Sequence, residues 1–228
     1  MKIIKAFVEQ ITPPIDGMEF LKSIELASRI YYKPKEKITD ELALALITKL
    51  VKNGHESIIE HTPRISMKFT CDRNVSHEIM QRRLFSVAQE STHYDYDNNE
   101  IIFILPYWFK EDSKNYLLTH KYTFDSDVYI IDDSDASYTS AEAQWVESML
   151  STEIVYWNLV GLGWLPQHAR SVLPNSLKTE LIVTGNIREW QCFFKLRTNI
   201  SSHSQTQEVA NMALELLKSQ IPVIFNDI

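Results

Sequence analysis

The most informative part of the chain is residues 81–94, which read QRRLFSVAQESTHY. This stretch leaves a short helical pattern and becomes almost entirely polar, yet it contains neither glycine nor proline. Gln89, Ser91, Thr92 and His93 offer side-chain and backbone donors that suit the base and phosphate of a nucleotide. Two interpretations stay open on these residues alone: a nucleotide-binding segment, or an ordinary polar passage from a helix into a loop.

Glycine is scarce in the rest of the chain. Only five glycines occur, at positions 17, 54, 161, 163 and 185, whereas about 7% of the residues of a protein are usually glycine. The G-x-G-x-x-G turn and the Walker A loop both need closely spaced glycines, which let the backbone approach a phosphate. Neither motif can be assembled here, so a bound nucleotide would have to be held by side chains or helix N-termini.

Arginine side chains are a candidate for that role. Most of the eight arginines fall into three polar clusters, and only Arg29 and Arg64 lie outside them. Guanidinium groups bind phosphate in a bidentate way, so the clusters favour anion binding, with surface ion pairing as the alternative. The clusters are Arg73/Arg82/Arg83, Arg170 and Arg188/Arg197.

The composition is that of a globular protein with a hydrophobic core. The 228 residues include 44% hydrophobic residues, and 23 basic against 30 acidic residues give a net charge of −7. There is no apolar run of about 18 residues, so no transmembrane helix is expected. The N-terminus lacks a signal-peptide core, and two cysteines do not make a disulfide framework. These features predict a cytoplasmic protein.

The histidines do not form a metal-binding pattern. Residues 55–59 read HESII, with isoleucine where H-E-x-x-H needs its second histidine. Neither cysteine pairs with a histidine at the spacing of a zinc site. We therefore expect no metal site.

Periodicity predicts a mixture of helices and strands. The long helix over 140–162 is expected to bury Trp145, Met149, Ile154 and Trp157. The helix over 42–51 should begin at Thr39 or Asp40 and end at Gly54, and a short helix through 79–84 should begin at Asn74 or Ser76. Further helices are expected over 190–196 and 205–217, and strands over 64–71, 101–105 and 180–184. The chain is predicted to be one α+β domain, residues 1–228.

Residues 81–94 resemble the signature of the flavin-dependent thymidylate synthases, R-H-R-x-x-S-x-x-Q/E-x-S-x-R-Y. Further elements of that family occur in the same order between about residues 54 and 208, two thirds of the chain. They are GHESIIEH (54–61), VSHE (75–78), ARSVLP (169–174), NIREW (186–190), FKLR (194–197), and His203 with Gln205. Because six elements match in order, chance is an improbable explanation.

The resemblance implies a fold and a reaction. Members of the family have an α+β fold, with helices packed on a small antiparallel-rich sheet. They methylate dUMP to dTMP with a methylene group from 5,10-methylenetetrahydrofolate and a hydride from FAD, which NADPH has reduced. They are homotetramers whose sites are shared between subunits. The resemblance implies neither a nucleic acid polymer nor a membrane as partner.

The resemblance also assigns residues to the site. Arg197 matches the arginine that stabilises uracil ionised at N3, and Ser91 matches a substrate ligand rather than a covalent nucleophile. The FAD-binding positions are Ser57, Gln81, Arg82, Arg83, Gln89, Asn186, Arg188 and Cys192. The dUMP-binding positions are Glu78 to Gln81, Gln89, Glu90, Ser91, Thr92, His93, Arg170 and Arg197.

The chain departs from the family pattern within the signature. Gln81-Arg82-Arg83 replaces Arg-His-Arg, His93 replaces the last arginine, and Glu78 stands where glutamine is usual. Histidine has an unperturbed pKa near 6.5, so His93 carries only part of a charge at neutral pH. A charge-assisted contact to phosphate contributes about 1.5–3 kcal/mol, so two lost cations would weaken ligand binding. Arg82 is a candidate to restore one charge.

Three functions remain open. The chain is a thymidylate synthase with a repacked phosphate site, a relative that modifies C5 of another pyrimidine nucleotide such as dCMP or UMP, or a nucleotide- or flavin-binding protein without turnover. The retained Arg170, Ser91, Arg188 and Arg197 favour an active enzyme. Arg197 also favours uracil over cytosine, because cytosine has no N3 proton to remove.

Overall fold

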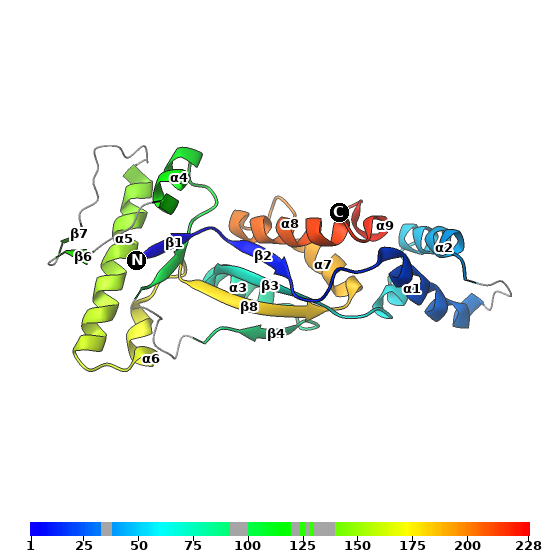
Figure 1. The fold of residues 1–228 in the computed structure, drawn as a ribbon, viewed down its shortest axis with the longest axis horizontal. Helices are drawn as coiled ribbons and strands as arrows, with labels where there is room; N and C mark the ends of the chain where they lie inside the picture. The colour runs from blue at the N-terminus through cyan, green and yellow to red at the C-terminus, as the bar shows by residue number, and fades with distance from the viewer. Residues whose placement is uncertain (33–37, 92–99, 120–123, 126–127, 130–139) are drawn as a thin grey trace. The chain divides into compact units, whose positions relative to one another are not determined.

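A computed structural model describes residues 1–32, 38–91, 100–119, 124–125, 128–129 and 140–228 (Figure 1). The strands are β1 (Lys2–Ile4), β2 (Phe7–Gln10), β3 (Ile65–Asp72), β4 (Ser86–Gln89), β5 (Ile102–Ile104), β6 (Phe124–Asp125), β7 (Val128–Tyr129) and β8 (Lys178–Gly185). The α-helices are α1 (Gly17–Tyr32), α2 (Asp40–Lys52), α3 (Arg73–Met80), α4 (Glu111–Thr119), α5 (Ser140–Gly161), α6 (Pro166–Ala169), α7 (Ile187–Arg197), α8 (Ser204–Lys218) and α9 (Pro222–Phe225). Short 3-10 helices are η1 (Glu56–Glu60) and η4 (Arg170–Val172).

The largest described sheet has four strands in the order β2-β3-β8-β4. Its two central strands run antiparallel, because the hydroxyls of Ser66 and Thr184 meet at 2.8 Å while Arg73 N donates to Leu177 O at 3.1 Å. Two smaller sheets accompany it, a parallel pair of β1 with β5 and an antiparallel pair of β6 with β7. The expected α+β class is confirmed.

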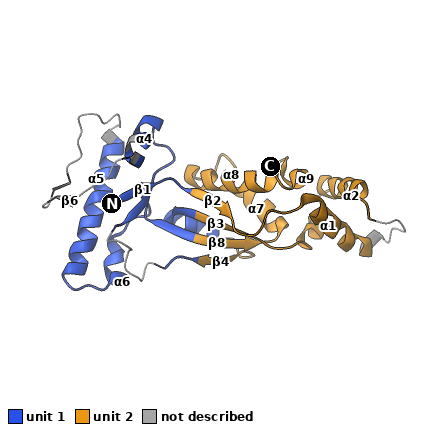
Figure 2. Cartoon of the chain, in the orientation of Figure 1, with its two compact units in different colours: residues 1–6, 70–79, 89–180 blue, residues 7–69, 80–88, 181–228 orange. Residues whose placement is uncertain are grey.

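The chain divides into two compact units (Figure 2). Unit 1 comprises residues 1–6, 70–79 and 89–180, and unit 2 comprises residues 7–69, 80–88 and 181–228. Each unit is built from segments far apart in the sequence. The single domain expected from the sequence stays a prediction.

The core of unit 2 is aromatic. Helices α7 and α8 cover one face of its strands (Figure 1), and Trp190 of α7 donates its indole N–H to Ile65 O at 3.3 Å. The rings of Phe69 and Phe85 pack on Trp190, with centroids 6.2 and 4.6 Å away. Gly185 permits this packing, because a Cβ atom there would lie 2.4 Å from the Phe85 ring.

The core of unit 1 gathers apolar side chains from β1, β5 and α5. Two buried glutamates of α5 lie among them and accept hydrogen bonds from the chain around them. Glu142 accepts from Lys110 N at 2.9 Å and from the Ser113 hydroxyl at 3.1 Å, while Glu153 accepts from Ile101 N at 3.0 Å. These carboxylates satisfy backbone groups that burial would otherwise leave unpaired.

Most of the expected elements are confirmed, and the stretch after α3 is where the expectation was wrong. The helix expected to run through residue 84 ends at Met80, and a strand, β4, lies within the polar segment for which no strand is predicted. The cap of α3 is Asp72, whose Oδ1 accepts from Val75 N at 2.6 Å, and not Asn74 or Ser76.

Candidate functional site

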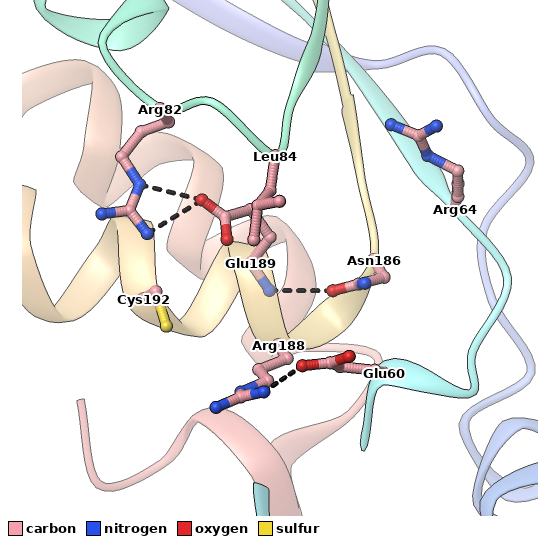
Figure 3. A pocket seen from close by; sticks show the side chains of 8 residues that line it. All are labelled: Glu60, Arg64, Arg82, Leu84, Asn186, Arg188, Glu189 and Cys192. Carbon is pink, nitrogen blue, oxygen red and sulfur yellow. Dashed lines mark hydrogen bonds and ion pairs between the residues drawn. The ribbon is translucent and has the colours of Figure 1, made fainter. Parts of the chain in front are cut away.

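A cavity of about 470 Å³ lies in unit 2 beside the N-terminal half of α7 (Figure 3). Its walls come from η1, from the residue before β3, from the turn after α3 and from α7 itself, so four separate segments meet there. The lining residues are Glu60, Arg64, Arg82, Leu84, Asn186, Arg188, Glu189 and Cys192.

Asn186 fixes the N-terminus of α7 at this cavity. Its backbone is extended, and its side-chain Oδ1 accepts a hydrogen bond from Glu189 N at 2.9 Å, which is the geometry of a helix N-cap. The amide Nδ2 has no partner in the described part of the chain. Asn186 therefore caps the helix with one atom and keeps two donor hydrogens for a ligand. Arg188 and Cys192 follow four residues apart, which places them on one face of α7.

Arg82 enters the cavity from the turn after α3, and Glu189 holds it there. Arg82 Nε and Nη2 both donate to Glu189 Oε1 at 2.8 Å (Figure 3). Glu189 is only 4% exposed, and the Arg82 guanidinium is the counter-ion of this buried carboxylate. The guanidinium is thereby fixed in direction, and most of its charge is balanced before any ligand arrives.

Arg188 lies against the acidic residues of η1. Its Nη1 donates to Glu60, and its Nε lies 3.8 Å from Glu56, which also pairs with Lys195 at 3.0 Å. The hydrogen bond to Glu60 raises the pKa of Arg188 above the usual range of a guanidinium. Arg188 therefore stays charged, and an anionic ligand has to compete with Glu60 for it.

Arg64 is the lining cation that the sequence did not suggest. Its Nη2 donates to Ser86 Oγ at 2.9 Å and to Thr184 O at 2.8 Å, and it has no carboxylate partner in the described part of the chain. The available signal was its isolation: it is one of two arginines outside the three clusters, and it begins the alternating stretch 64–71.

The cavity suits an anionic group. Three arginines and two glutamates line it, and the Asn186 amide adds uncommitted donors. A cavity of this volume can hold part of a large cofactor, and the pyrophosphate of FAD has the matching charge and acceptor oxygens. The donor set present therefore fits that cofactor.

The cavity gathers four of the eight predicted FAD residues: Arg82, Asn186, Arg188 and Cys192. The other four do not line it. Ser57 and Arg83 are exposed, Gln81 contacts Arg197, and Gln89 belongs to unit 1.

Arg197, the predicted catalytic residue, ends α7 and is half-buried. Its Nη2 donates to Gln81 Oε1 at 3.1 Å. Both residues belong to unit 2, so the structure joins two predicted site residues that are 116 positions apart.

Residues at the end of β4 are fixed within unit 1. The Gln89 amide donates to the hydroxyls of Ser76 and Thr179 at 2.9 and 3.2 Å, which orients its carbonyl oxygen. The Glu90 carboxylate pairs with Lys178 at 3.1 Å and accepts from Glu180 N at 3.0 Å. Among the described residues the Gln89 oxygen has no side-chain partner and can accept from a ligand, whereas Glu90 already supports β8.

The remaining predicted substrate residues are spread over unit 1. Glu78 belongs to α3, exposed Ser91 follows β4, and half-buried Arg170 begins η4. Thr92 and His93 lie outside the described residues.

Comparison with known proteins identifies the family. The sequence model of the Thy1 family, described as thymidylate synthase complementing protein, matches residues 15–223. A curated flavin-dependent thymidylate synthase from Corynebacterium aurimucosum is 28% identical over 206 residues, which cover 90% of this chain and 78% of that protein. Another, from Pyrococcus furiosus, is 28% identical over 79% of this chain and 64% of its own length. The chain belongs to this family.

The family resemblance expected from the sequence is therefore confirmed, and the chain is an enzyme of the flavin-dependent thymidylate synthase type. An identity of 28% makes it a divergent member. Its fold is similar to that of the UMP/dUMP methylase PolB from Streptomyces cacaoi, a structure bound with 5-Br dUMP. The TM-score is 0.73 at 19% identity, over 99% of this chain and 96% of that one.

None of the helices in the described part of the chain combines the length and the apolar composition needed to cross a membrane. The described residues also contain no group of three or more histidine, cysteine or acidic side chains placed to hold a metal ion.

Proposed function

We propose that the enzyme methylates dUMP to dTMP reductively, with 5,10-methylenetetrahydrofolate as carbon donor, NADPH as reductant and FAD as cofactor. The observation that carries this proposal is the cavity at α7, because side chains from the 54–61, 81–94 and 186–190 motifs meet around it. These motifs are distant in the sequence, and their convergence on one anion-accepting cavity is what a cofactor site requires.

In this proposal the flavin pyrophosphate lies against Arg188, Asn186 and Arg64. Asn186 donates through its uncommitted amide, and Arg64 supplies a guanidinium that no carboxylate of the described chain balances. When bound, the flavin supplies the hydride of the reaction. Arg82 orients the pyrophosphate but does little to neutralise it, since Glu189 already balances the charge of Arg82.

Arg197 activates the pyrimidine. The C5 atom of uracil is a poor carbon nucleophile until negative charge enters the ring. A guanidinium at the pyrimidine edge favours the N3 anion over the neutral ring, and it stabilises the charge that shifts as C5 attacks the carbon donor. The fixed carbonyl oxygen of Gln89 and the side chains of Ser91, His93 and Arg170 are proposed to hold the rest of the nucleotide.

We also propose a homotetramer in the cytoplasm, with sites that subunits share. The predicted substrate residues are divided between units 1 and 2 of a chain, with Arg170 in one and Arg197 in the other. The resemblance of the motifs to the family supports this assembly, which sedimentation can measure.

A second candidate is C5 modification of another pyrimidine nucleotide, such as UMP or dCMP. The altered triplet 81–83 and His93 favour it, because they change the residues that the family places around its ligands. The similar fold of a UMP/dUMP methylase gives this candidate further support.

Flavin absorbance tests both candidates. The purified protein, loaded with FAD, is titrated anaerobically with dUMP, UMP and dCMP in turn, and NADPH is then added. Perturbed flavin bands with dUMP, followed by bleaching with NADPH, are expected. A response to UMP or dCMP alone would support the second candidate. Failure to bind FAD would overturn both and leave a protein without this chemistry.

A further inference from the structure

Gln81 is the residue of the triplet 81–83 that contacts the candidate catalytic arginine. Its Oε1 accepts the hydrogen bond from Arg197 Nη2 at 3.1 Å. In the described part of the chain this is the one side-chain partner that Gln81 has. The contact lies wholly within unit 2, so it belongs to a single compact part of the chain.

A neutral amide has particular properties in this position. Its carbonyl oxygen accepts a hydrogen bond and so fixes the direction of the guanidinium, but it carries no charge that would cancel the positive charge of Arg197. A glutamate would fix the direction and also balance that charge. An arginine has donors only, so it would bring a like charge to hydrogen-bond distance and push Arg197 away.

The neighbours of Gln81 do not duplicate this contact. Arg82 is bound to Glu189 through Nε and Nη2. Arg83 is exposed and has no side-chain partner in the described residues. The acceptor for Arg197 within this triplet is therefore Gln81, the position at which the chain departs from the arginine of the family signature.

We propose that Gln81 is a positioning residue that orients the Arg197 guanidinium toward the pyrimidine ring without neutralising it. The proposal rests on the proposed function, because it assigns Arg197 to the nucleotide. It explains the departure from Arg-His-Arg as a changed way of holding the same catalytic group.

Three substitutions at Gln81 distinguish its effect on the direction of the Arg197 guanidinium from its effect on the charge of that group. Gln81→Met keeps the size of the side chain and removes the acceptor. Gln81→Glu keeps the acceptor and adds a negative charge. Gln81→Arg introduces the residue usual in the family. All three are expected to lower kcat, by about tenfold to a hundredfold as for a misplaced catalytic group, while the nucleotide KM changes less.

The direct readout is the ionisation of a bound probe. The probe is 5-fluoro-dUMP, whose N3 proton leaves more readily than that of dUMP and whose ultraviolet spectrum changes when it does. The native protein should lower the N3 pKa of the bound probe. Gln81→Met and Gln81→Glu should raise it back toward the value of the free nucleotide by about one unit, a tenfold change in the ionisation constant. In the Arg197→Lys background, Gln81→Met should add little.

Gln144→Met is the matched control, since Gln144 is exposed on α5 and its side chain has one hydrogen bond within the described residues, to Glu147 at 3.0 Å. It should leave both readouts unchanged. If the native protein binds the probe and lowers its N3 pKa, but Gln81→Met does the same with unchanged kcat, the positioning role is refuted and the proposed function survives. If the native protein leaves the N3 pKa of 5-fluoro-dUMP unchanged, the role assigned to Arg197 fails and the positioning role fails with it.

Discussion

At the scale of single residues, the counter-ions of the arginines set what each can do. Arg82 and Arg188 line the cavity paired with Glu189 and Glu60, whereas Arg64 is held by a hydroxyl and a backbone carbonyl. An arginine that is paired with a carboxylate gives an anionic ligand directed hydrogen bonds but little net charge. An arginine without a carboxylate partner adds net positive charge. The net attraction for an anion therefore depends strongly on Arg64, although the whole chain has a net charge of −7.

Replacement of Arg197 tests its assigned role. Arg197→Ala should lower turnover by a factor of roughly 10² or more, the usual cost of removing a group that stabilises developing charge. It should reduce the free energy of unfolding by about 1 kcal/mol or less, because the side chain is only half-buried. Steady-state kinetics and thermal unfolding measure the two effects. Lys195→Ala, at an exposed position of the same helix, is the control; full activity of Arg197→Ala would refute the mechanism.

The buried thiol of Cys71 gives a pH dependence of stability. Burial raises the pKa of Cys71, so the folded state keeps the proton while the unfolded state loses it above about pH 8.5. The folded state then binds more protons than the unfolded state, and stability falls as the pH rises above that value, by about 1.4 kcal/mol per unit at most. Urea unfolding between pH 8 and 10 measures the slope. Cys71→Ala should flatten it, and an unchanged slope would contradict the assignment.

The sequence predicted the residues of the site better than their partners. Arg188 and Asn186, which line the cavity, fall in the short motif 186–190 that the sequence displays. Arg64 was missed, and so was the neutralisation of Arg82 by Glu189, because those contacts join positions 22 to 120 residues apart.

At the scale of elements, the N-terminus of α7 carries both stability and ligand binding. Asn186→Ala should reduce stability by about 1 kcal/mol through loss of the cap, and it should also weaken FAD binding. Asn186→Asp keeps the capping oxygen, so stability should be retained, but its negative charge faces the cavity and should weaken FAD binding. Thermal unfolding without ligand and FAD titration measure the two effects separately.

Thr39→Ala is the matched control for the cap. Thr39 Oγ1 accepts from Leu42 N at the start of α2, at 3.3 Å, so its loss should reduce stability and leave FAD affinity unchanged. Equal FAD affinity in the native protein and Asn186→Asp would place the cofactor elsewhere.

Helix α5 shows why periodicity alone misplaces a buried face. The sequence predicted its bounds within a residue, and Met149 is buried as expected. Trp145 and Trp157 are only partly buried, because the buried face runs through Glu142 and Glu153. Those carboxylates accept hydrogen bonds from backbone N–H groups of other segments, and Glu153 also pairs with the N-terminal ammonium at 2.8 Å. Apolar spacing cannot reveal such partners.

At the scale of the whole molecule, the proposed assembly can be measured directly. Sedimentation at micromolar concentration should give about four times the 26.6 kDa mass of the chain. A stable monomer that is fully active would contradict a site shared between subunits.

Assemblies mixed from two variants test more sharply whether subunits share a site. Arg170→Ala and Arg197→Ala proteins, each inactive alone, are refolded together from denaturant. If Arg170 and Arg197 of one site come from different subunits, the mixture should regain part of the native activity. No regain in a mixture shown to contain both chains would mean that one subunit supplies both residues.

The α+β class and the order of the motifs were predictable, because both are local patterns. The parallel pairing of β1 with β5 was not, since its strands are about a hundred residues apart and β1 has only three residues. The same holds for the division into two units, whose segments alternate along the chain.

The most direct measurement of the central claim is the mass of the nucleotide product. The FAD-loaded protein is incubated anaerobically with dUMP, 5,10-methylenetetrahydrofolate and NADPH, and the nucleotide is analysed by mass spectrometry against a reaction with Arg197→Ala. The account predicts a product heavier than dUMP by one CH₂ group that co-elutes with dTMP, formed only by the native protein. Unchanged dUMP in the native reaction, with FAD and dUMP both bound, would contradict it.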